Sequence, residues 1–322
     1  PQDIAESSQK PRRSKLQLWN DLKISAITRS FTLIYTLALL TLLTRIQLNL
    51  LGRRSYLSSV ILLATSGNDN QTTINSDNQN YDSPDQIYGN DFETNRKYLT
   101  FSWWLLHRGW RELMLKVEAV VKEVFGVLSP RDELTIEKFL ELTLKVRKKI
   151  ESSTEAEREQ SKWLDFLLPP RDQEEIILEE TGITPSLRRL LDETSDLIDT
   201  APFTHILTLL LDAGFSTLID QKVSQEAFKI PSESQVSKFP APEVSKYNPA
   251  KLPLILAVLS RQAHIIGAGV STTNEYLQAM EKVSDLEAFA AVVYSSNWEN
   301  EIYPDSSEKN RDENEEISHD DM

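Results

Sequence analysis

The sequence contains no cysteine, which excludes a disulfide framework, a thiolate metal site and a cysteine nucleophile, and suits a reducing compartment such as the cytosol. Glycine is scarce, at nine of 322 residues, and this scarcity favours helices. Basic residues are outnumbered by acidic ones: the sequence has 35 Lys and Arg but 49 Asp and Glu, which gives a net charge of −14. Binding to phosphate backbones needs clustered positive charge, so this balance counts against a nucleic-acid-binding protein.

One long helix is predicted over residues 16–51, a segment without glycine or proline. Its middle, Phe31 to Leu43, is almost entirely apolar but is shorter than the ~20 apolar residues that a membrane-spanning helix needs. We therefore predict a buried central helix rather than a membrane span. Gly52-Arg53-Arg54 is expected to end this helix, and residues 56–64 are expected to form a short helix that packs back on it.

Polar segments divide the rest of the chain. Residues 1–14 are predicted to be a polar linker. Residues 67–95, rich in Asn, Asp, Ser and Gln, are predicted to be a disordered insertion. Residues 299–322 carry ten acids against two basic residues, and this composition predicts a disordered acidic tail. The body between them, residues 15–298, is expected to be one helical domain.

Hydrophobic spacing near 3.6 residues and local start and stop signals predict the further helices of this body. They are expected over residues 97–125, from a cap at Ser129-Pro130 to Lys149, over 163–168 before Pro169-Pro170, after Thr184-Pro185, after Thr200-Ala201-Pro202, over 254–266, and after a capping box at Ser284–Glu287. Residues 231–253 are expected to form an extended loop. Strand-like alternation does not stand out, so the predicted fold is all-α, a single-domain helical bundle around one long central helix.

Catalytic motifs are not found in the sequence. It has no phosphate-binding loop, no G-x-S-x-G and no cluster with metal-ligand spacing. His205 and His264 lie on apolar helices and are expected to be core residues, while neighbouring glutamates are best explained as solvated helix faces. The sequence therefore predicts a protein that is not an enzyme, with no cofactor, no metal and no small-molecule substrate.

A candidate recognition surface lies in the first turns of the long helix. Trp19, Leu22 and Lys23 share one face, with Lys15 one turn earlier. An aromatic anchor beside aliphatic and basic residues is typical of a protein-binding hot spot and would suit an acidic amphipathic helix. The alternative, that Trp19 only packs the start of the helix against the body, remains open at this point.

Six segments of the sequence carry a family resemblance: KLQLWNDLKISAITRS, TRIQLNLLG, LLDETSDLIDTAPFTHIL, GFSTLID, AKLP and LEAFAAVVYSS. In this order they resemble the peroxin-3 family, whose members are docking factors for the import of peroxisomal membrane proteins. The similarity runs from about Lys15 to Tyr294, and the arginine pair after Gly52 and the polar insertion are similar to the fungal branch.

The resemblance implies a peroxisomal membrane protein with an amino-terminal anchor and a helical domain facing the cytosol. It further implies that residues 1–14 follow this anchor, which the sequence given does not contain. It implies docking of peroxin-19, the chaperone and receptor of new membrane proteins, through an amphipathic helix set into a groove. The groove residues that carry over are Lys15, Trp19, Leu22, Lys23 and Lys251. Two other functions remain as alternatives. One is a helical scaffold that tethers organelle-inheritance or autophagy adaptors while Trp19 is purely structural; the other, an all-α hydrolase or lipid-modifying enzyme, lacks a catalytic constellation.

Overall fold

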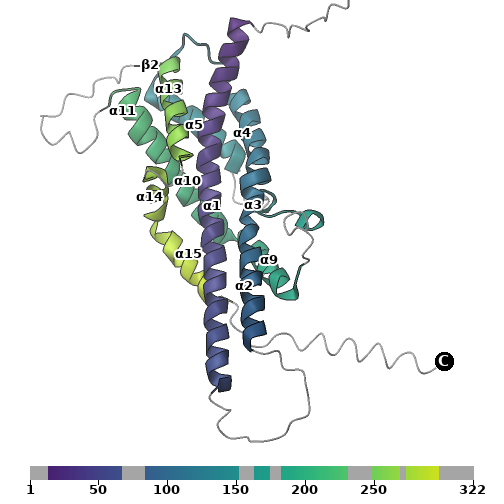
Figure 1. Cartoon of the computed structure of the whole chain (residues 1–322). Coiled ribbons are helices and arrows are strands. Elements are labelled where there is room, and N and C mark those ends of the chain that lie inside the picture. The colour runs from purple at the N-terminus through teal and green to yellow at the C-terminus, as the bar shows by residue number, and fades with distance from the viewer. Residues whose placement is uncertain are drawn as a thin grey trace, which may run out of the picture.

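The structure, a computed structural model, describes residues 14–66, 84–151, 163–174, 183–230, 249–268 and 273–296. These residues form helices apart from one two-stranded ladder, which confirms the predicted all-α fold (Figure 1). In chain order the elements are α1 (Lys15–Ser66), α2 (Pro84–Thr100), α3 (Ser102–Trp104), the π-helix η1 (Leu105–Gly109), α4 (Trp110–Phe125), β1 (Glu133–Leu134), α5 (Ile136–Glu151), α7 (Leu164–Leu167), the 3-10 helix η2 (Arg171–Gln173), α9 (Pro185–Ile198), α10 (Ala201–Ser216), the π-helix η3 (Thr217–Val223), α11 (Ser224–Glu226), β2 (Ala250–Lys251), α13 (Leu252–Ile266), α14 (Glu275–Glu281) and α15 (Ser284–Ser295).

The helix α1 runs the length of the molecule and contacts α4, α10, α13 and α15 (Figure 1). Its apolar middle is the core of the bundle, as predicted. The side chains there that are fully buried are Phe31, Ile34, Tyr35, Ala38, Leu39, Leu42 and Leu43. Lys15–Val60 and Ala201–Glu226 are long and apolar enough to cross a membrane by length and composition, a test that the core helix of a soluble bundle also passes. In the structure, 72% and 56% of their most apolar windows are buried inside the body.

The predicted break at Gly52 is wrong, and so is the short helix packing back over residues 56–64. The helix α1 continues through Gly52 to Ser66. A single helical glycine costs only about 1 kcal/mol relative to alanine, and the next residue, Arg53, supplies a compensating interaction. The buried Arg53 guanidinium donates to Glu193 Oε2 at 2.6 Å and to the carbonyl oxygen of Ser296 at 2.5 Å. These contacts bind the helix to α9 and to the end of α15.

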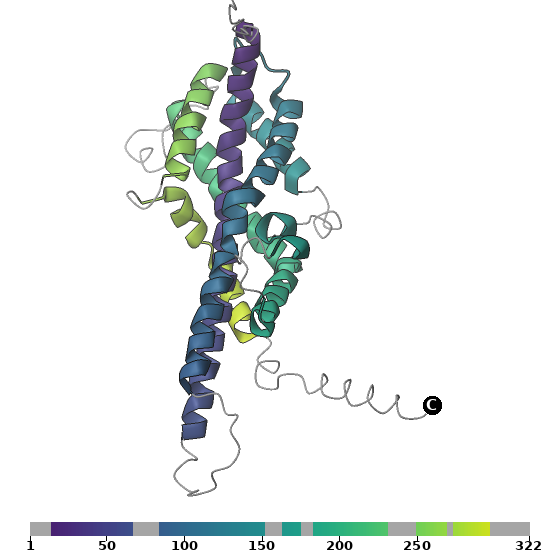
Figure 2. The same ribbon diagram turned by 45° about the vertical axis from the view of Figure 1, so that its right-hand side comes forward.

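Part of the predicted insertion is helical. Residues 84–95 belong to α2, which lies along the carboxyl-terminal half of α1 (Figure 2), so the loop prediction is wrong for this part. Gln47 Nε2 donates to the carbonyl oxygen of Tyr98 at 3.0 Å, and the Tyr98 hydroxyl lies 2.5 Å from Thr194 Oγ1. These contacts join α2 to α1 and α9, and tertiary packing of this kind outweighs a polar composition.

Some of the predictions concern segments outside the described residues. They are the linker before Ser14, the part of the insertion at 67–83, the extended loop at 231–248 and the acidic tail at 299–322.

A threonine with proline one or two residues later correctly predicts two helix starts. The Thr184 hydroxyl accepts from the amide of Leu187 at 3.2 Å, and Thr200 caps α10 in the same way. These are N-caps, which satisfy amides that have no partner within the helix.

Two other predicted start signals are wrong. Ser129 begins a turn rather than a helix, because its amide donates to Asp132 Oδ2 at 2.8 Å, and α5 starts only after its cap at Thr135. The helix α15 does begin at Ser284, but Val283 occupies the N-cap position and makes no side-chain cap, so the predicted capping box does not form.

A short antiparallel ladder closes one end of the bundle. Glu133 pairs with Lys251 and Leu134 pairs with Ala250. The amide of Leu252 also donates to the carbonyl oxygen of Asp132 at 3.1 Å. The ladder therefore fixes the segment before α5 against the start of α13, near the amino-terminal end of α1.

Candidate functional site

A reciprocal cap fixes the first turn of α1. The amide of Ser14 donates to Gln17 Oε1 at 3.0 Å, and the amide of Gln17 donates to Ser14 Oγ at 3.2 Å. This is the capping box S-x-x-Q, which satisfies two helix-start amides at once. The pattern is legible in the sequence as Ser14-Lys15-Leu16-Gln17, although the predicted helix start did not make use of it. It holds the residues that follow in helical register at the tip of the molecule.

Lys15 and Leu22 are exposed at this tip, with 53% of Leu22 accessible. Trp19, one turn after Lys15, is half-buried and packs against the hydrophobic core. Its indole Nε1 is buried without a hydrogen-bond partner among the described residues. The Trp19 ring thus contributes both to the packing of the helix start and to the surface beside Leu22.

The sequence predicts that Lys23 is a basic residue of the binding surface, but its side chain is fully buried. Its ammonium donates to the carbonyl oxygen of Gly126 at 3.1 Å and to that of Leu128 at 2.5 Å. Burial lowers the pKa of Lys23, and the nearby Asp132 carboxylate partly opposes that effect. Lys23 therefore fixes the turn at the end of α4 instead of presenting its charge at the surface.

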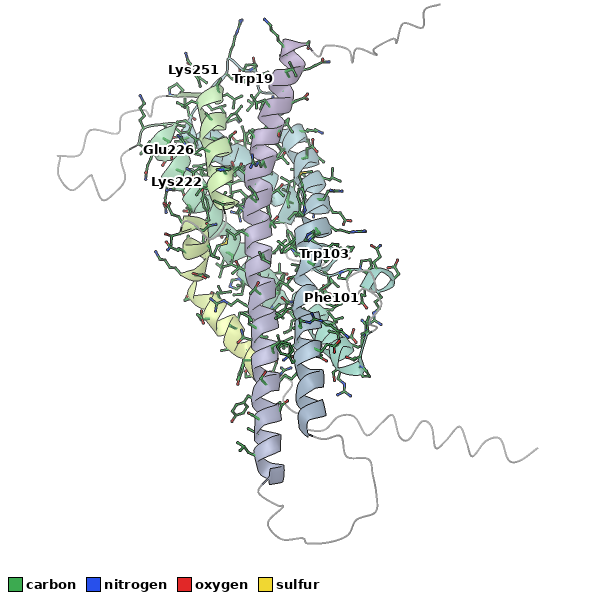
Figure 3. The ribbon with its side chains drawn as sticks, in the orientation of Figure 1. Trp19, Phe101, Trp103, Lys222, Glu226 and Lys251 are labelled. Carbon is green, nitrogen blue, oxygen red and sulfur yellow. The ribbon has the colours of Figure 1, made fainter. Side chains whose placement is uncertain are left out.

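Lys251 lies at the same end of the molecule as Trp19 (Figure 3). The antiparallel ladder places it there, although the two residues are far apart in the sequence. Like Lys15, it is exposed. Neither ammonium has an ion-pair partner within the described part of the chain, so both are available to attract an acidic ligand.

Further exposed apolar side chains lie in the same segments, and they were not among the predicted site residues. Leu16 and Leu18 are 62% and 53% accessible in the first turns of α1. Val127, in the turn that Lys23 fixes, is 85% accessible, and Leu254 in the first turn of α13 is 42% accessible. Val127 has no periodic signal. Leu18 is exposed because it lies opposite the core face of α1, whereas Leu16, in helical register with the buried Lys23 and Ile27, is exposed in the first turn of the helix. We call Lys15, Leu16, Leu18, Trp19, Leu22, Val127, Lys251 and Leu254 the tip surface.

Groups for metal or acid–base chemistry do not converge here. Among the described residues there is no group of three or more His, Asp or Glu side chains placed to hold a metal ion. The expectation that His205 and His264 are core residues is wrong, because both are exposed. The Nε2 atom of His205 lies 3.8 Å from Asp285 Oδ2. The core faces of α10 and α13 are formed by neighbouring residues of their helices instead.

Comparison with known proteins identifies relatives over nearly the whole chain. The family model Peroxin-3 matches residues 1–296. Peroxisomal biogenesis factor 3 of Yarrowia lipolytica is 36% identical over 92% of this chain and 73% of that protein. The peroxisomal membrane protein PEX3 of Komagataella pastoris is 31% identical over 91% of this chain and 72% of that protein. Peroxisomal biogenesis factor 3 of Rattus norvegicus is 26% identical over 88% of this chain and 71% of that protein.

Proposed function

The chain belongs to the peroxin-3 family, and from this premise we propose that its tip surface docks peroxin-19 for the insertion of peroxisomal membrane proteins. Membership gives the broader role directly: the protein is a peroxisome biogenesis factor of the peroxisomal membrane that interacts with peroxins. The family is not one of enzymes, and we propose that this member acts by binding alone.

The observation that carries the proposal is the chemistry of the tip surface. Exposed leucines flank a half-buried tryptophan, and unpaired lysine ammonium groups from α1 and β2 lie at the same end of the described structure. Binding hot spots are enriched in tryptophan set among aliphatic side chains. An amphipathic helix would bury its apolar face on Trp19 and Leu22, while acidic side chains on its flanks meet Lys15 and Lys251.

Lys15 and Lys251 belong to an acidic chain, whose net charge is −14 and which has ten of its acids in residues 299–322. An acidic partner would be attracted by these two lysines. Complementary charge of this kind directs the encounter and raises the association rate, an effect that salt screens. The docking rate is therefore expected to fall as ionic strength rises.

Isothermal titration with the amino-terminal peptide of peroxin-19 tests the proposal. We expect Trp19→Ala to cost roughly 2–4 kcal/mol of binding free energy, as for a central hot-spot residue. Lys15→Glu and Lys251→Glu should weaken binding less, mainly through association rate. Leu115→Ala and Lys148→Glu, at exposed positions on α4 and α5, are matched controls that should bind as the unmodified protein does.

The same titration separates docking from the purely structural alternative for Trp19. If Trp19→Ala lowers the melting temperature but binds the peptide with unchanged affinity, Trp19 only packs the helix start. The tip surface would then not be the docking site, and a tethering role for adaptors of organelle inheritance or autophagy would gain support.

A further inference from the structure

A cavity of about 790 Å³ lies on α1 between α4 and α13 and begins at Ser25, one turn after Leu22 of the tip surface. Figure 1 shows these two helices on either side of α1. The floor comes from Ser25, Thr28, Arg29, Thr32, Leu33 and Thr36, and the walls come from Leu106, Trp110, Met114, Glu118, His264 and Gly267. Its volume is in the range of pockets that hold small ligands, about 300–1,000 Å³. None of these residues belongs to the tip surface.

The two ends of the cavity differ in polarity. The helix α4 runs antiparallel to α1 (Figure 1), so Glu118 lies toward the Ser25 end and Leu106 toward the Thr36 end. The Ser25 end therefore gathers Arg29 and Glu118, whereas the other end is formed largely by Leu33, Leu106 and Trp110. This distribution of polarity matches that of an amphiphile, which has one charged end and one apolar end.

Two hydroxyl groups in the floor are buried without a partner. Thr28 and Thr32 are only 5% and 4% accessible, and neither Oγ1 atom has a hydrogen-bond partner among the described residues. Other α1 hydroxyls bond back along the helix, as Thr36 Oγ1 does to the carbonyl oxygen of Thr32 at 2.8 Å. A buried hydroxyl without a partner is costly, and such groups are uncommon in folded proteins. Both threonines line the cavity, and a rotation about χ1 would turn either hydroxyl toward a polar group of a bound molecule.

The free charge at the cavity is positive. Arg29 is exposed and has no ion-pair partner within the described residues. The one acidic residue of the lining, Glu118, is neutralised by Lys122, whose Nζ lies 2.7 Å from Glu118 Oε1. An anionic group seated at this end would pair with Arg29 and accept hydrogen bonds from the threonine hydroxyls.

We propose that this cavity binds one long-chain fatty acid, with the carboxylate at Arg29 and the threonines and the acyl chain along Leu33, Leu106 and Trp110. The lining from Ser25 to Thr36 extends about 16 Å along α1 at 1.5 Å per residue, so a long acyl chain fits within the cavity volume in a bent form rather than a fully extended one. The fatty acid is a resident ligand and undergoes no reaction.

Binding of the fluorescent fatty acid cis-parinaric acid to the full chain, below its micellar concentration, tests the proposal. We expect saturable binding of one probe per chain. Palmitate should displace the probe at a concentration at least tenfold lower than the neutral hexadecan-1-ol does. Arg29→Ala should abolish that preference, because it weakens the binding of palmitate about tenfold and leaves the binding of hexadecan-1-ol unchanged. Arg189→Ala, an exposed arginine on α9, is the matched control and should alter neither ligand.

Filling the apolar end should remove the site. Leu33→Trp is expected to weaken probe binding at least tenfold, with helical circular dichroism unchanged. If this variant does not fold, Gly267→Leu serves the same purpose, because a Cβ atom at Gly267 would lie 3.8 Å from Leu33 Cδ2. Palmitate should raise the melting temperature of the unmodified protein but not of the filled variant. Absence of saturable probe binding, or probe binding unchanged in a folded filled variant, would overturn the proposal.

Discussion

The Nζ atom of Lys23 lies 2.5 Å from the carbonyl oxygen of Leu128, a hydrogen bond between residues 105 positions apart. A second bond from the same ammonium to Gly126 completes the contact. The two carbonyl groups belong to the turn that ends α4 and carries Val127, and the ladder that places Lys251 begins a few residues later. One buried lysine thus links the first turns of α1 to the other segments of the tip surface.

Lys23→Met is expected to lower the free energy of unfolding by about 1–3 kcal/mol, because two carbonyl groups lose their donor. Urea denaturation followed by circular dichroism measures this. Lys15→Met at the exposed start of the same helix is the control and should change stability by no more than about 0.5 kcal/mol. Equal stability of the two variants would show that the Lys23 bonds contribute nothing.

Arg53→Met should be among the most destabilising changes in the protein. The Arg53 side chain is fully buried and forms an ion pair of 2.6 Å with Glu193, which is itself only 14% accessible. Removing one member of a buried pair leaves the other charge in a poorly solvated place, at a cost of about 3–5 kcal/mol. Denaturant unfolding tests this, and adding Glu193→Gln to Arg53→Met should restore part of the loss. If the double variant is less stable than Arg53→Met alone, the desolvated Glu193 charge does not explain the loss.

Gly109, at the end of the π-helix η1, is expected to tolerate no side chain. A Cβ atom there would lie 1.9 Å from the backbone oxygen of Phe166, so α7 would have to move. We expect Gly109→Ala to destabilise by at least about 2 kcal/mol, as for overpacking of a core. Gly267→Ala is the matched control, since its nearest contact would be 3.4 Å, and its melting temperature should change little. A melting temperature of Gly109→Ala equal to that of the control would contradict the close packing of α7 on η1.

Stability should fall as the pH rises above about 10, the ordinary pKa of tyrosine. Burial raises the pKa of Tyr35, Tyr98 and Tyr276 above that value in the folded protein. The unfolded chain then releases protons that the folded chain retains, so the free energy of unfolding decreases with rising pH.

Phenolate absorbance and circular dichroism, followed together during an alkaline titration, should show that part of the tyrosine signal appears only as the helices melt. Tyr98→Phe should reduce the slope of stability against pH in this range. Tyr56→Phe, at a tyrosine that is 52% accessible, should leave it unchanged. Complete titration of all tyrosines in the folded protein would contradict this prediction.

Features of the fold that depend only on neighbouring residues are predicted in part from the sequence. A threonine with proline one or two residues later marks the starts of α9 and α10, because a cap needs only a side-chain oxygen within three residues of the amide it accepts from, whereas the signals at Ser129 and Ser284 do not form caps. The same local reasoning fails at Gly52 and over residues 84–95. There the helix is held by Arg53 and Tyr98, whose partners lie on α9 and α15.

The residues of the candidate site likewise fall into those that helical spacing predicts and those that only the tertiary structure places. Helical spacing identifies the tryptophan and leucine of the first turns of α1, and the structure places both at the tip. Sequence spacing could not show that Lys23 points inward to Gly126 and Leu128, since that direction depends on where α4 ends. Nor could it show that His264 lines a cavity formed by three helices.

The sequence by itself determined the all-α class, the buried central helix and the family, because composition, apolar spacing and segment similarity are properties of the chain alone. The tertiary structure decided which lysine is buried, which apolar residues remain at the tip, and where unpaired hydroxyls face a cavity. The physical reason is that burial and hydrogen bonding depend on the partner that each side chain meets, and those partners lie up to 243 residues away.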